Sequence, residues 1–251
     1  METGLGVIVL AAGLGKRMKS EKAKVLHKID GQPMILRVLK TAAKVAGDDI
    51  IVVVGHQANE VKKTLSQAHN PIYAFQKEQL GTGHAVLTAL SLVPAHIEKL
   101  LILYGDVPLL AAKTVKKFVN FHNKEKCDIS ILAVESPDPE GYGRVVLTRS
   151  NMVKKIIEEA DATCGEKKIK LINTGIYCVD RNFLMDSAQR LKPDNTQKEY
   201  YLTDIIEMAY KEKQISRAFI TTNIEETRGI NSREELLIAE AILKKRRRKI
   251  S

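Results

Sequence analysis

The sequence predicts an α/β protein in which helices cover both faces of a mostly parallel, mixed sheet. Its first half contains apolar runs rich in Val, Ile and Leu, as buried strands do, at residues 5–10, 50–54, 72–75 and 100–104. Segments with a helical spacing of apolar residues separate these runs, at residues 34–45, 58–67 and 84–92. Near-continuous apolar strands that alternate with helices are typical of a parallel sheet buried on both faces.

The pattern changes from about Cys127 onward. Shorter strand-like segments separated by turns occur at residues 129–134, 144–147, 152–157, 171–179 and 216–220. Helical segments occur at residues 202–210 and 233–249. We therefore predict an antiparallel or mixed extension beside the first half. The predicted domain covers residues 1–229, with halves at about 1–126 and 127–229, and a helical arm with a basic tail covers residues 230–251.

Composition limits the possible classes of protein. The chain has 251 residues, 44% of them hydrophobic, which is enough for a sizeable core. Its three cysteines form no C-x-x-C pair, so we expect neither a zinc site nor a disulfide framework. The first apolar run is short and ends in glycines and cations, unlike a signal peptide, and no run is long enough to span a membrane. We expect a cytoplasmic protein with no membrane partner.

Part of the formal net charge of +10 lies in the terminal run Lys244–Lys249. Such a run can bind nucleic acid, or it can form the solvated end of a helix, where cations complement the helix dipole. We favour the solvated helix end over a nucleic-acid partner, because neither interleaved aromatic residues nor a nucleic-acid module accompanies the run. The remaining positive charge suits an anionic small-molecule substrate.

The first predicted strand runs directly into the segment Ala11-Ala12-Gly13-Leu14-Gly15-Lys16-Arg17-Met18. Glycine turns of this kind expose backbone N–H groups that can cradle phosphate oxygens, and the adjacent cations add charge. The spacing differs from both common phosphate loops. Met18 stands where a dinucleotide fingerprint has its third glycine, and Lys16 lacks the spaced glycine and the following Ser or Thr of a P-loop. An ordinary strand-to-helix turn is the alternative interpretation.

Polar residues follow two other predicted strands, at Gln76 and Asp106. Because the carboxyl ends of parallel strands meet at one edge of a sheet, these residues and the glycine turn are expected to converge. Asp106 suits a magnesium ion beside phosphate oxygens, or alternatively it caps the next helix. The Gln76 amide can read a base beside the turn Gly81–Gly83, for which a simple helix cap is the alternative. The pair Gly141 and Gly143 indicates a hairpin turn or one wall of a sugar pocket.

Several segments resemble one family, in order, along nearly the whole chain. They are Leu10–Met18, Lys24–His27, Gln79–Ala85, Tyr104–Leu109, Gly141–Arg144, Glu158, Asn173–Ile176, Glu199–Ile206 and Gly229–Asn231. Together they resemble the uridylyltransferase domain of bacterial N-acetylglucosamine-1-phosphate uridyltransferases. The first segment is shared by many sugar nucleotidyltransferases, whereas Gln79–Ala85 and Glu199–Ile206 are much narrower signatures. The resemblance implies a Rossmann-like nucleotide-diphospho-sugar transferase fold, with a nucleotide-binding first half and a sugar-binding second half.

The resemblance also implies roles for individual residues. The nucleotide site would be lined by the backbone of Leu10, Ala11, Ala12 and Gly13. The triphosphate would be held by Arg17 and Lys24, which together with Asp106 form the implied catalytic set. Uracil and its surroundings would be read by Gln76, Gly81 and Thr82. The site would also be lined by Tyr104 and Gly105, and magnesium would be bound by Asp106 and Asn231. The N-acetyl sugar would contact Gly141, Glu158, Asn173, Tyr201 and Thr203.

The implied reaction transfers UMP from UTP to N-acetylglucosamine-1-phosphate, and gives UDP-N-acetylglucosamine and pyrophosphate with Mg²⁺ as cofactor. The chain lacks the hexapeptide repeats of the acetyltransferase domain that bifunctional members carry, so we expect no acetyl transfer; a separate acetyltransferase is one source of the acetylated sugar phosphate. Ala160 stands where many relatives have a Lys near the sugar phosphate. The alternatives are a related transferase for glucose-1-phosphate or dTTP, and a non-catalytic nucleotide-sugar sensor or RNA-binding subunit.

Overall fold

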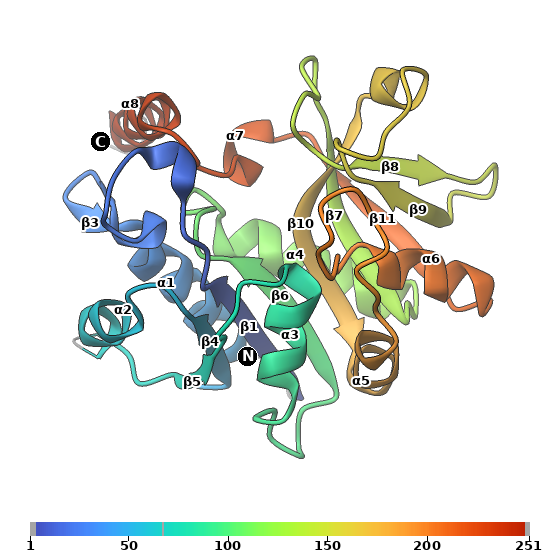
Figure 1. Cartoon of the computed structure of the whole chain (residues 1–251), viewed down its shortest axis with the longest axis horizontal. Coiled ribbons are helices and arrows are strands. Elements are labelled where there is room, and N and C mark those ends of the chain that lie inside the picture. The colour runs from blue at the N-terminus through green and yellow to red at the C-terminus, as the bar shows by residue number, and fades with distance from the viewer. Residues whose placement is uncertain (1–3, 67, 249–251) are drawn as a thin grey trace.

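A single sheet organises the molecule. The structure, a computed structural model, describes residues 4–66 and 68–248, apart from the side chain of Lys16. Within these residues, nine strands form a sheet with the main order β11-β7-β10-β6-β1-β4-β5, and β8 and β9 attach beside β10 (Figure 1). Its parallel core consists of β1 (Leu5–Ala11), β4 (Ile50–Val54), β5 (Ile72–Phe75) and β6 (Lys99–Tyr104). The predicted mostly parallel sheet is therefore confirmed.

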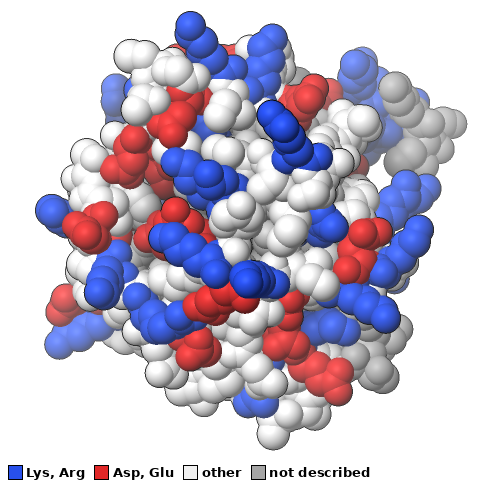
Figure 2. Space-filling model, turned by 90° about the vertical axis from the view of Figure 1, so that its right-hand side faces the viewer, with Lys and Arg blue, Asp and Glu red and all other residues white. Residues whose placement is uncertain are grey.

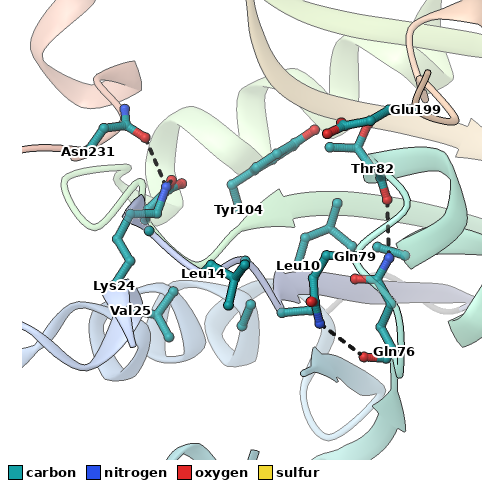
Figure 3. Close-up of a pocket in the computed structure, with 17 residues that line it drawn as sticks. Leu10, Leu14, Lys24, Val25, Gln76, Gln79, Thr82, Tyr104, Glu199 and Asn231 are labelled. Atoms are coloured by element: carbon teal, nitrogen blue, oxygen red, sulfur yellow. Dashed lines mark hydrogen bonds and ion pairs between the residues drawn. The ribbon is translucent and has the colours of Figure 1, made fainter. Parts of the chain in front are cut away.

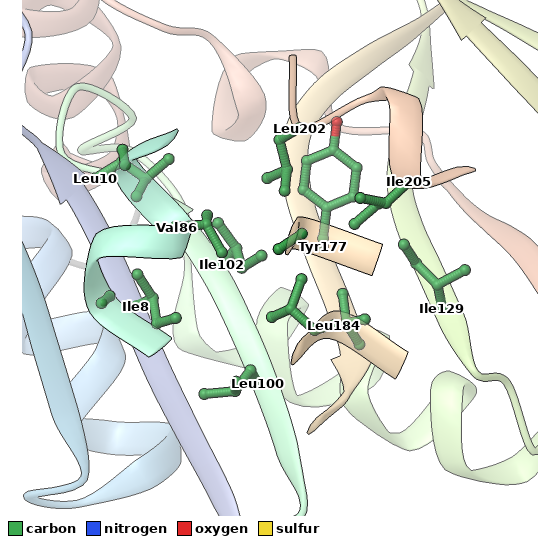
Figure 4. Packing of buried hydrophobic residues seen from close by; sticks show 14 of the residues in the cluster. Ile8, Leu10, Val86, Leu100, Ile102, Ile129, Tyr177, Leu184, Leu202 and Ile205 are labelled. Atoms are coloured by element: carbon green, nitrogen blue, oxygen red, sulfur yellow. The ribbon is translucent and has the colours of Figure 1, made fainter. Parts of the chain in front are cut away.

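Helices cover both faces of this sheet. One face carries α1 (Met34–Ala46), α2 (Ala58–Leu65) and α4 (Ala112–Lys124), and the other carries α3 (Thr82–Leu90), α5 (Arg181–Gln189) and α6 (Asp204–Lys211). Successive side chains of a strand point to opposite faces. Val7 and Val9 of β1 therefore pack with α1, whereas Ile8 and Leu10 pack in the other core, with α3, α5 and α6 (Figure 4). Burial on both faces explains why the strand shows no polar alternation.

The second half of the chain continues the same sheet. β10 (Leu171–Asp180) runs antiparallel between β6 and β7 (Ile129–Glu135), and β11 (Ser216–Thr221) is parallel to β7. β8 (Arg144–Leu147) and β9 (Val153–Ile157) form an antiparallel hairpin that joins β10. The predicted mixed extension is thus confirmed, and hydrogen bonds between β6 and β10 make it part of the first half's sheet rather than a separate one.

The last helix packs against a small hairpin at one side of the molecule (Figure 1). The hairpin consists of β2 (Lys28–Ile29) and β3 (Gln32–Pro33), and the last helix is α8 (Arg233–Arg248), which follows the short α7 (Ile224–Thr227). Their contact is an apolar cluster of Ile29, Met34, Leu109, Ile230 and Ala239. The helix predicted at 233–249 is therefore present over its described residues, and Lys249 lies outside them. Short 3-10 helices complete the chain, at η1 (Lys16–Met18), η2 (Lys24–Leu26) and η3 (Glu166–Lys168).

Three helices of the described residues, α4, α5 and the short α7, were not among the elements predicted from the sequence. The buried face of α4 recurs at helical spacing, but lysines interrupt it in the sequence. The cap of α5 is hidden because Asp180 is also the last residue of β10. Its carboxylate accepts a hydrogen bond from the N–H of Asn182 at 2.9 Å, as an N-cap does. Other boundaries moved by a few residues: α3 begins at Thr82, and α2 ends at Leu65, with residue 67 outside the description.

Charge of both signs is distributed over one face of the molecule. Figure 2 shows acidic and basic side chains interspersed on the face that carries β8, β9 and α6. None of the helices in the described part of the chain has the length and apolar character needed to cross a bilayer. The cytoplasmic location stays a prediction.

Candidate active site

A cavity of about 530 Å³ opens at the carboxyl ends of β1, β5 and β6 (Figure 3). The glycine turn after β1, Gln76 after β5 and Asp106 after β6 all line it, so the predicted convergence is confirmed. Sequence-predicted site residues that line this cavity are Leu10, Ala11, Ala12, Gly13, Lys24, Gln76, Gly81, Thr82, Tyr104, Asp106 and Asn231. Further lining residues that were not predicted as site residues are Leu14, Gly15, Val25, Gln79, Ala85 and Glu199.

The glycine turn is shaped by close contact with the segment that carries Lys24. Gly15 has a φ of +64°, and a Cβ added there would lie 2.6 Å from the Cβ of Lys24. Gly13 faces open space instead, with nothing within 4 Å of such a Cβ. The N–H of Met18 donates to the Gly15 carbonyl at 2.9 Å, and the Met18 side chain is fully buried. Met18 thus anchors the turn in the core and leaves the open backbone at Gly13 free to approach a ligand.

Three polar side chains from distant parts of the chain form a cluster on one wall of the cavity (Figure 3). Lys24 Nζ pairs with Asp106 Oδ2 and donates to Asn231 Oδ1 at 2.9 Å. The backbone joins the same segments, since the N–H of Ile230 donates to the Asp106 carbonyl at 2.9 Å. The side chains of Lys24 and Asp106 are 16% and 13% exposed, so the pair is mostly shielded from water. Asp106 does not cap α4, whose N-cap is Ala111, and the alternative interpretation as a helix cap is wrong.

The oxygens of Asp106 and Asn231 converge on one cation, the Lys24 ammonium. A carboxylate and an amide oxygen are ligands that Mg²⁺ accepts, and it usually takes few protein ligands beside substrate phosphates and water. Among the described residues, no group of three or more His, Cys, Asp or Glu side chains could hold a metal by itself. The donor set therefore fits a magnesium ion that shares its coordination with a phosphate ligand.

Gln76 lies at the opposite wall and is 3% exposed. Its Nε2 donates to the Gly81 carbonyl at 3.2 Å and lies 3.0 Å from His84 Nδ1, so the carbonyl partner sets the orientation of the amide. Within the described part of the chain, no hydrogen bond is formed by Gln76 Oε1. The two N–H groups of the Gln76 amide thus face the Gly81 carbonyl and His84 Nδ1, and the predicted donor and acceptor pair is reduced to the acceptor Oε1.

The turn before α3 is tied to the segment before α6. Gly81 has a φ of +112°, and a Cβ there would lie 2.6 Å from the Tyr200 carbonyl oxygen. The N–H of Gly83 donates to the same carbonyl at 2.8 Å, and Thr82 Oγ1 accepts from the N–H of Leu202 at 3.1 Å. These bonds bring Glu199 to the cavity. Its position in the narrow signature Glu199–Ile206 was the signal that could have identified it.

The residues assigned to the sugar do not line this cavity, and several of them form a second cluster. Thr203 Oγ1 donates to Glu158 Oε1 at 3.1 Å, and burial raises the pKa of the Glu158 carboxyl, although this hydrogen bond opposes the rise. Asn173 Nδ2 donates to Tyr177 Oη at 2.7 Å, and Asn173 Oδ1 accepts from the N–H of Gly175 at 3.0 Å.

Tyr104 connects the two regions. It lines the cavity, and a Cβ added at Gly175 would lie 2.8 Å from its ring. Burial raises the pKa of the Tyr104 hydroxyl, and the nearby Glu158 carboxylate adds to this effect. Tyr104 is therefore a residue of the cavity wall that also lies within electrostatic reach of Glu158.

The other predicted residues lie around this arrangement. Tyr201 is buried, and its hydroxyl donates to Gln197 Oε1 at 2.7 Å. Gly141 is exposed at a turn between β7 and β8, and because these strands pair with β10 rather than with each other, the interpretation as a hairpin turn is wrong. Gly105 does not line the cavity, and its N–H donates to the Leu10 carbonyl at 2.9 Å. Arg17 is exposed, and its charge opposes the burial that raises the pKa of Tyr142.

These features define an α/β protein whose cavity is lined by a glycine turn on one side and by the Lys24–Asp106–Asn231 cluster on another. The chain belongs to the MobA-like NTP transferase domain family, whose model matches residues 7–172. It is therefore a nucleotidyltransferase by family.

Curated relatives carry the name bifunctional protein GlmU. The protein from Desulfotalea psychrophila is 40% identical over 246 residues, which cover 98% of this chain and 72% of that protein. The protein from Thermoanaerobacter pseudethanolicus is 44% identical over 243 residues, 97% of this chain and 52% of that protein. The resemblance predicted from the motifs is thus confirmed. The chain spans about half the length of most curated relatives that it matches.

Solved structures of low sequence identity share the fold. A putative glucose-1-phosphate thymidylyltransferase from Bacillus anthracis matches with a TM-score of 0.72 at 20% identity, over 95% of this chain and 94% of that one. HddC from Yersinia pseudotuberculosis matches with a TM-score of 0.69 at 22% identity, over 95% of this chain and 99% of that one. The predicted fold class is confirmed by both.

Proposed function

We propose that this chain transfers UMP from UTP to N-acetylglucosamine-1-phosphate, with release of pyrophosphate. The observation that carries the proposal is the cluster of Lys24, Asp106 and Asn231, which faces the glycine turn and Gln76 across one cavity. One wall offers charge for phosphates, and the other offers backbone and an amide acceptor for a base. The family membership and the GlmU relatives support the same reaction class.

In this proposal the triphosphate lies between the glycine turn and Lys24. Exposed backbone at Gly13 lets the phosphates approach closely, and the Lys24 ammonium neutralises their charge. The phosphate oxygen of the sugar phosphate attacks the α-phosphorus in line with the departing pyrophosphate. Because that phosphate is ionised at neutral pH, the protein needs no strong general base. Its contribution is positioning and neutralisation of charge.

Asp106 and Asn231 would hold Mg²⁺, which supplies positive charge to the phosphate oxygens when it is bound. Both oxygens already face one cation in this structure, which supports that assignment. Once Asp106 binds Mg²⁺, the Lys24 ammonium would be released from this carboxylate and would be free to contact the triphosphate. Arg17, which the resemblance assigns to the triphosphate, is exposed after the glycine turn and does not line the cavity.

The base is selected by the acceptor that remains on Gln76. Its Nε2 faces both the Gly81 carbonyl and His84 Nδ1, so Oε1 is the group left for a ligand, and it accepts a hydrogen bond. Uracil and thymine present an imide N–H, whereas cytosine presents a ring acceptor at the same position. A buried acceptor facing an acceptor costs the desolvation of both groups, which disfavours cytosine by about 1–3 kcal/mol.

The sugar would occupy the side of the site beyond Tyr104. The Glu158–Thr203 pair offers oxygen acceptors for sugar hydroxyls, and Asn173 lies on β10 beside it. Tyr104 supports this placement because it lines the cavity and because the Glu158 carboxylate contributes to the raised pKa of its hydroxyl. The strictness for the acetylated sugar is part of the proposal and rests on the resemblance.

Pyrophosphate release tests the proposal directly. The reaction contains UTP and N-acetylglucosamine-1-phosphate, with and without Mg²⁺, beside parallel reactions with glucosamine-1-phosphate, glucose-1-phosphate, dTTP and CTP. Magnesium-dependent release with UTP and the acetylated sugar alone supports the proposal. If the protein prefers glucose-1-phosphate or dTTP, the proposal is wrong and the chain is a related sugar-1-phosphate nucleotidyltransferase. If it binds UDP-N-acetylglucosamine but releases no pyrophosphate with any substrate, it is a nucleotide-sugar sensor.

A further inference from the structure

The helix α8 is bound to the loop that carries Asp106 at both of its ends. Three residues before α8 begins, the N–H of Ile230 donates to the Asp106 carbonyl at 2.9 Å. At its far end, Arg246 Nη1 donates to the Leu109 carbonyl at 2.9 Å. The Leu109 side chain is buried under the same helix, beside Ala239. The loop from Asp106 to Leu109 is therefore held along the length of α8.

The same helix also holds the hairpin that follows Lys24. The N–H of Asp30, at the hairpin turn, donates to Glu240 Oε1 at 3.1 Å. The Asp30 carboxylate pairs with Arg247 of α8 and with Arg37 of α1, the latter at 3.4 Å. Apolar contact between Ala239 and the hairpin completes this interface. The segment that carries Lys24 is thus attached to α8 as well.

The third member of the cluster, Asn231, immediately precedes α8. Glu235 accepts hydrogen bonds from the N–H groups of Asn231 and Ser232, and Ser232 Oγ accepts from the Glu235 N–H at 3.2 Å. This reciprocal capping box fixes the start of the helix. The direction of the Asn231 side chain therefore depends on the position of α8. The contacts at the C-terminal end of α8 help to set the position of this helix.

We propose that α8 is a positioning element of the active site, and that Arg246 keeps the Asp106 loop in register with Asn231 by holding the Leu109 carbonyl. The catalytic role of the cluster of Lys24, Asp106 and Asn231 rests on the proposed function. The positioning of Asp106 and Asn231 by α8 does not depend on it. Arg246 does not line the cavity, and it lies near the far end of α8, whose 16 residues are about 24 Å long. Its effect on the active site is therefore indirect. The predicted solvated helix end describes Arg247, whose side chain is 68% exposed although it pairs with Asp30. Arg246 departs from that interpretation, because its guanidinium binds the Leu109 carbonyl.

Substitutions at the end of α8 test this proposal. Arg246→Ala removes the bond to Leu109, Arg246→Lys keeps a cationic donor, and Arg248→Ala is the matched control because Arg248 is exposed on the same helix end. Hydrogen exchange is measured at the Ile230 amide, whose acceptor is the Asp106 carbonyl. Binding of Mn²⁺ to the nucleotide-free protein is measured by electron paramagnetic resonance, and the Mg²⁺ concentration for half-maximal turnover and the melting temperature are measured beside it.

Arg246→Ala is expected to raise exchange at Ile230 about tenfold, and to raise the Mn²⁺ dissociation constant and the half-saturating Mg²⁺ concentration by a similar factor. Arg246→Lys should recover most of this loss, and Arg248→Ala should match the parent protein. A lowered melting temperature with unchanged exchange and unchanged metal binding would show that Arg246 serves stability alone, and would overturn the proposal. If the parent protein transfers no nucleotide, the proposed function fails, and exchange and Mn²⁺ binding still decide the positioning role.

Discussion

Replacing Lys24 by Met separates two effects of one ammonium group. In the structure Lys24 Nζ faces the oxygens of both Asp106 and Asn231, where the proposed metal would lie. The ammonium therefore competes with the metal in the nucleotide-free protein, although it assists the reaction once the triphosphate is bound. Lys24→Met should consequently tighten metal binding and at the same time slow turnover.

The magnitude follows from the contact that the metal must displace. Hydrogen bonds to charged groups contribute about 1.5–3 kcal/mol. The Lys24 and Asp106 side chains are 16% and 13% exposed and retain some contact with water, so the lower end applies. About 1.5 kcal/mol corresponds to a roughly tenfold lower Mn²⁺ dissociation constant in Lys24→Met. Loss of a charge that stabilises the transition state should lower the rate by about 10²-fold.

Both quantities are accessible with one variant and one control. Mn²⁺ binding is titrated by electron paramagnetic resonance without nucleotide, and turnover is measured by pyrophosphate release at saturating UTP. Lys28→Met serves as the control, because Lys28 is exposed on the neighbouring hairpin. Unchanged or weaker Mn²⁺ binding in Lys24→Met would refute the idea that the ammonium occupies the metal position.

Three further predictions follow from the same structure. Asp106→Ala should lower turnover by about 10²-fold or more without a large change in melting temperature, and a near-normal magnesium-dependent rate would remove Asp106 from the metal site. Gly81→Ala puts a methyl group at a φ of +112° and 2.6 Å from the Tyr200 carbonyl, so urea unfolding should show a loss of about 1–3 kcal/mol. Gly165→Ala, where nothing lies within 4 Å, should change the free energy of unfolding by less than about 0.5 kcal/mol, and equal losses would contradict the steric argument. Burial raises the pKa of Asp204 from 3.8 to about 6, so between these values the folded state keeps a proton that the unfolded state releases. Stability should therefore fall as pH rises through this window, and Asp204→Asn should reduce that slope in denaturation measured across it.

Local patterns in the sequence were enough to predict the sheet and the edge where the site lies. Unbroken apolar runs such as Ile50–Val54 require burial on both faces, and this requirement implies helices above and below a parallel sheet. Because parallel strands end at one edge, the glycine turn, Gln76 and Asp106 had to meet there. No knowledge of side-chain packing was needed for this step.

The interactions within the site depend on packing that no local pattern encodes. Lys24 and Asn231 are 207 residues apart in the sequence, and their contact exists because α8 packs on the β2–β3 hairpin. Gln76 keeps only its acceptor because Gly81, at a φ of +112° that glycine adopts freely, turns its carbonyl toward the Gln76 amide. The sequence pattern alone offered both donor and acceptor.

The difference between what the sequence predicts and what only the structure shows has one physical cause. Burial and strand direction are averages over several neighbouring side chains, so the amino-acid sequence by itself determined the fold class, the order of most strands and helices along the chain, and the glycine turn. A hydrogen bond depends on the placement of two atoms to within a few tenths of an ångström. Only the tertiary structure could therefore decide that Lys24 bridges Asp106 and Asn231, that Glu199 enters the cavity, and that Arg246 reaches the Leu109 carbonyl.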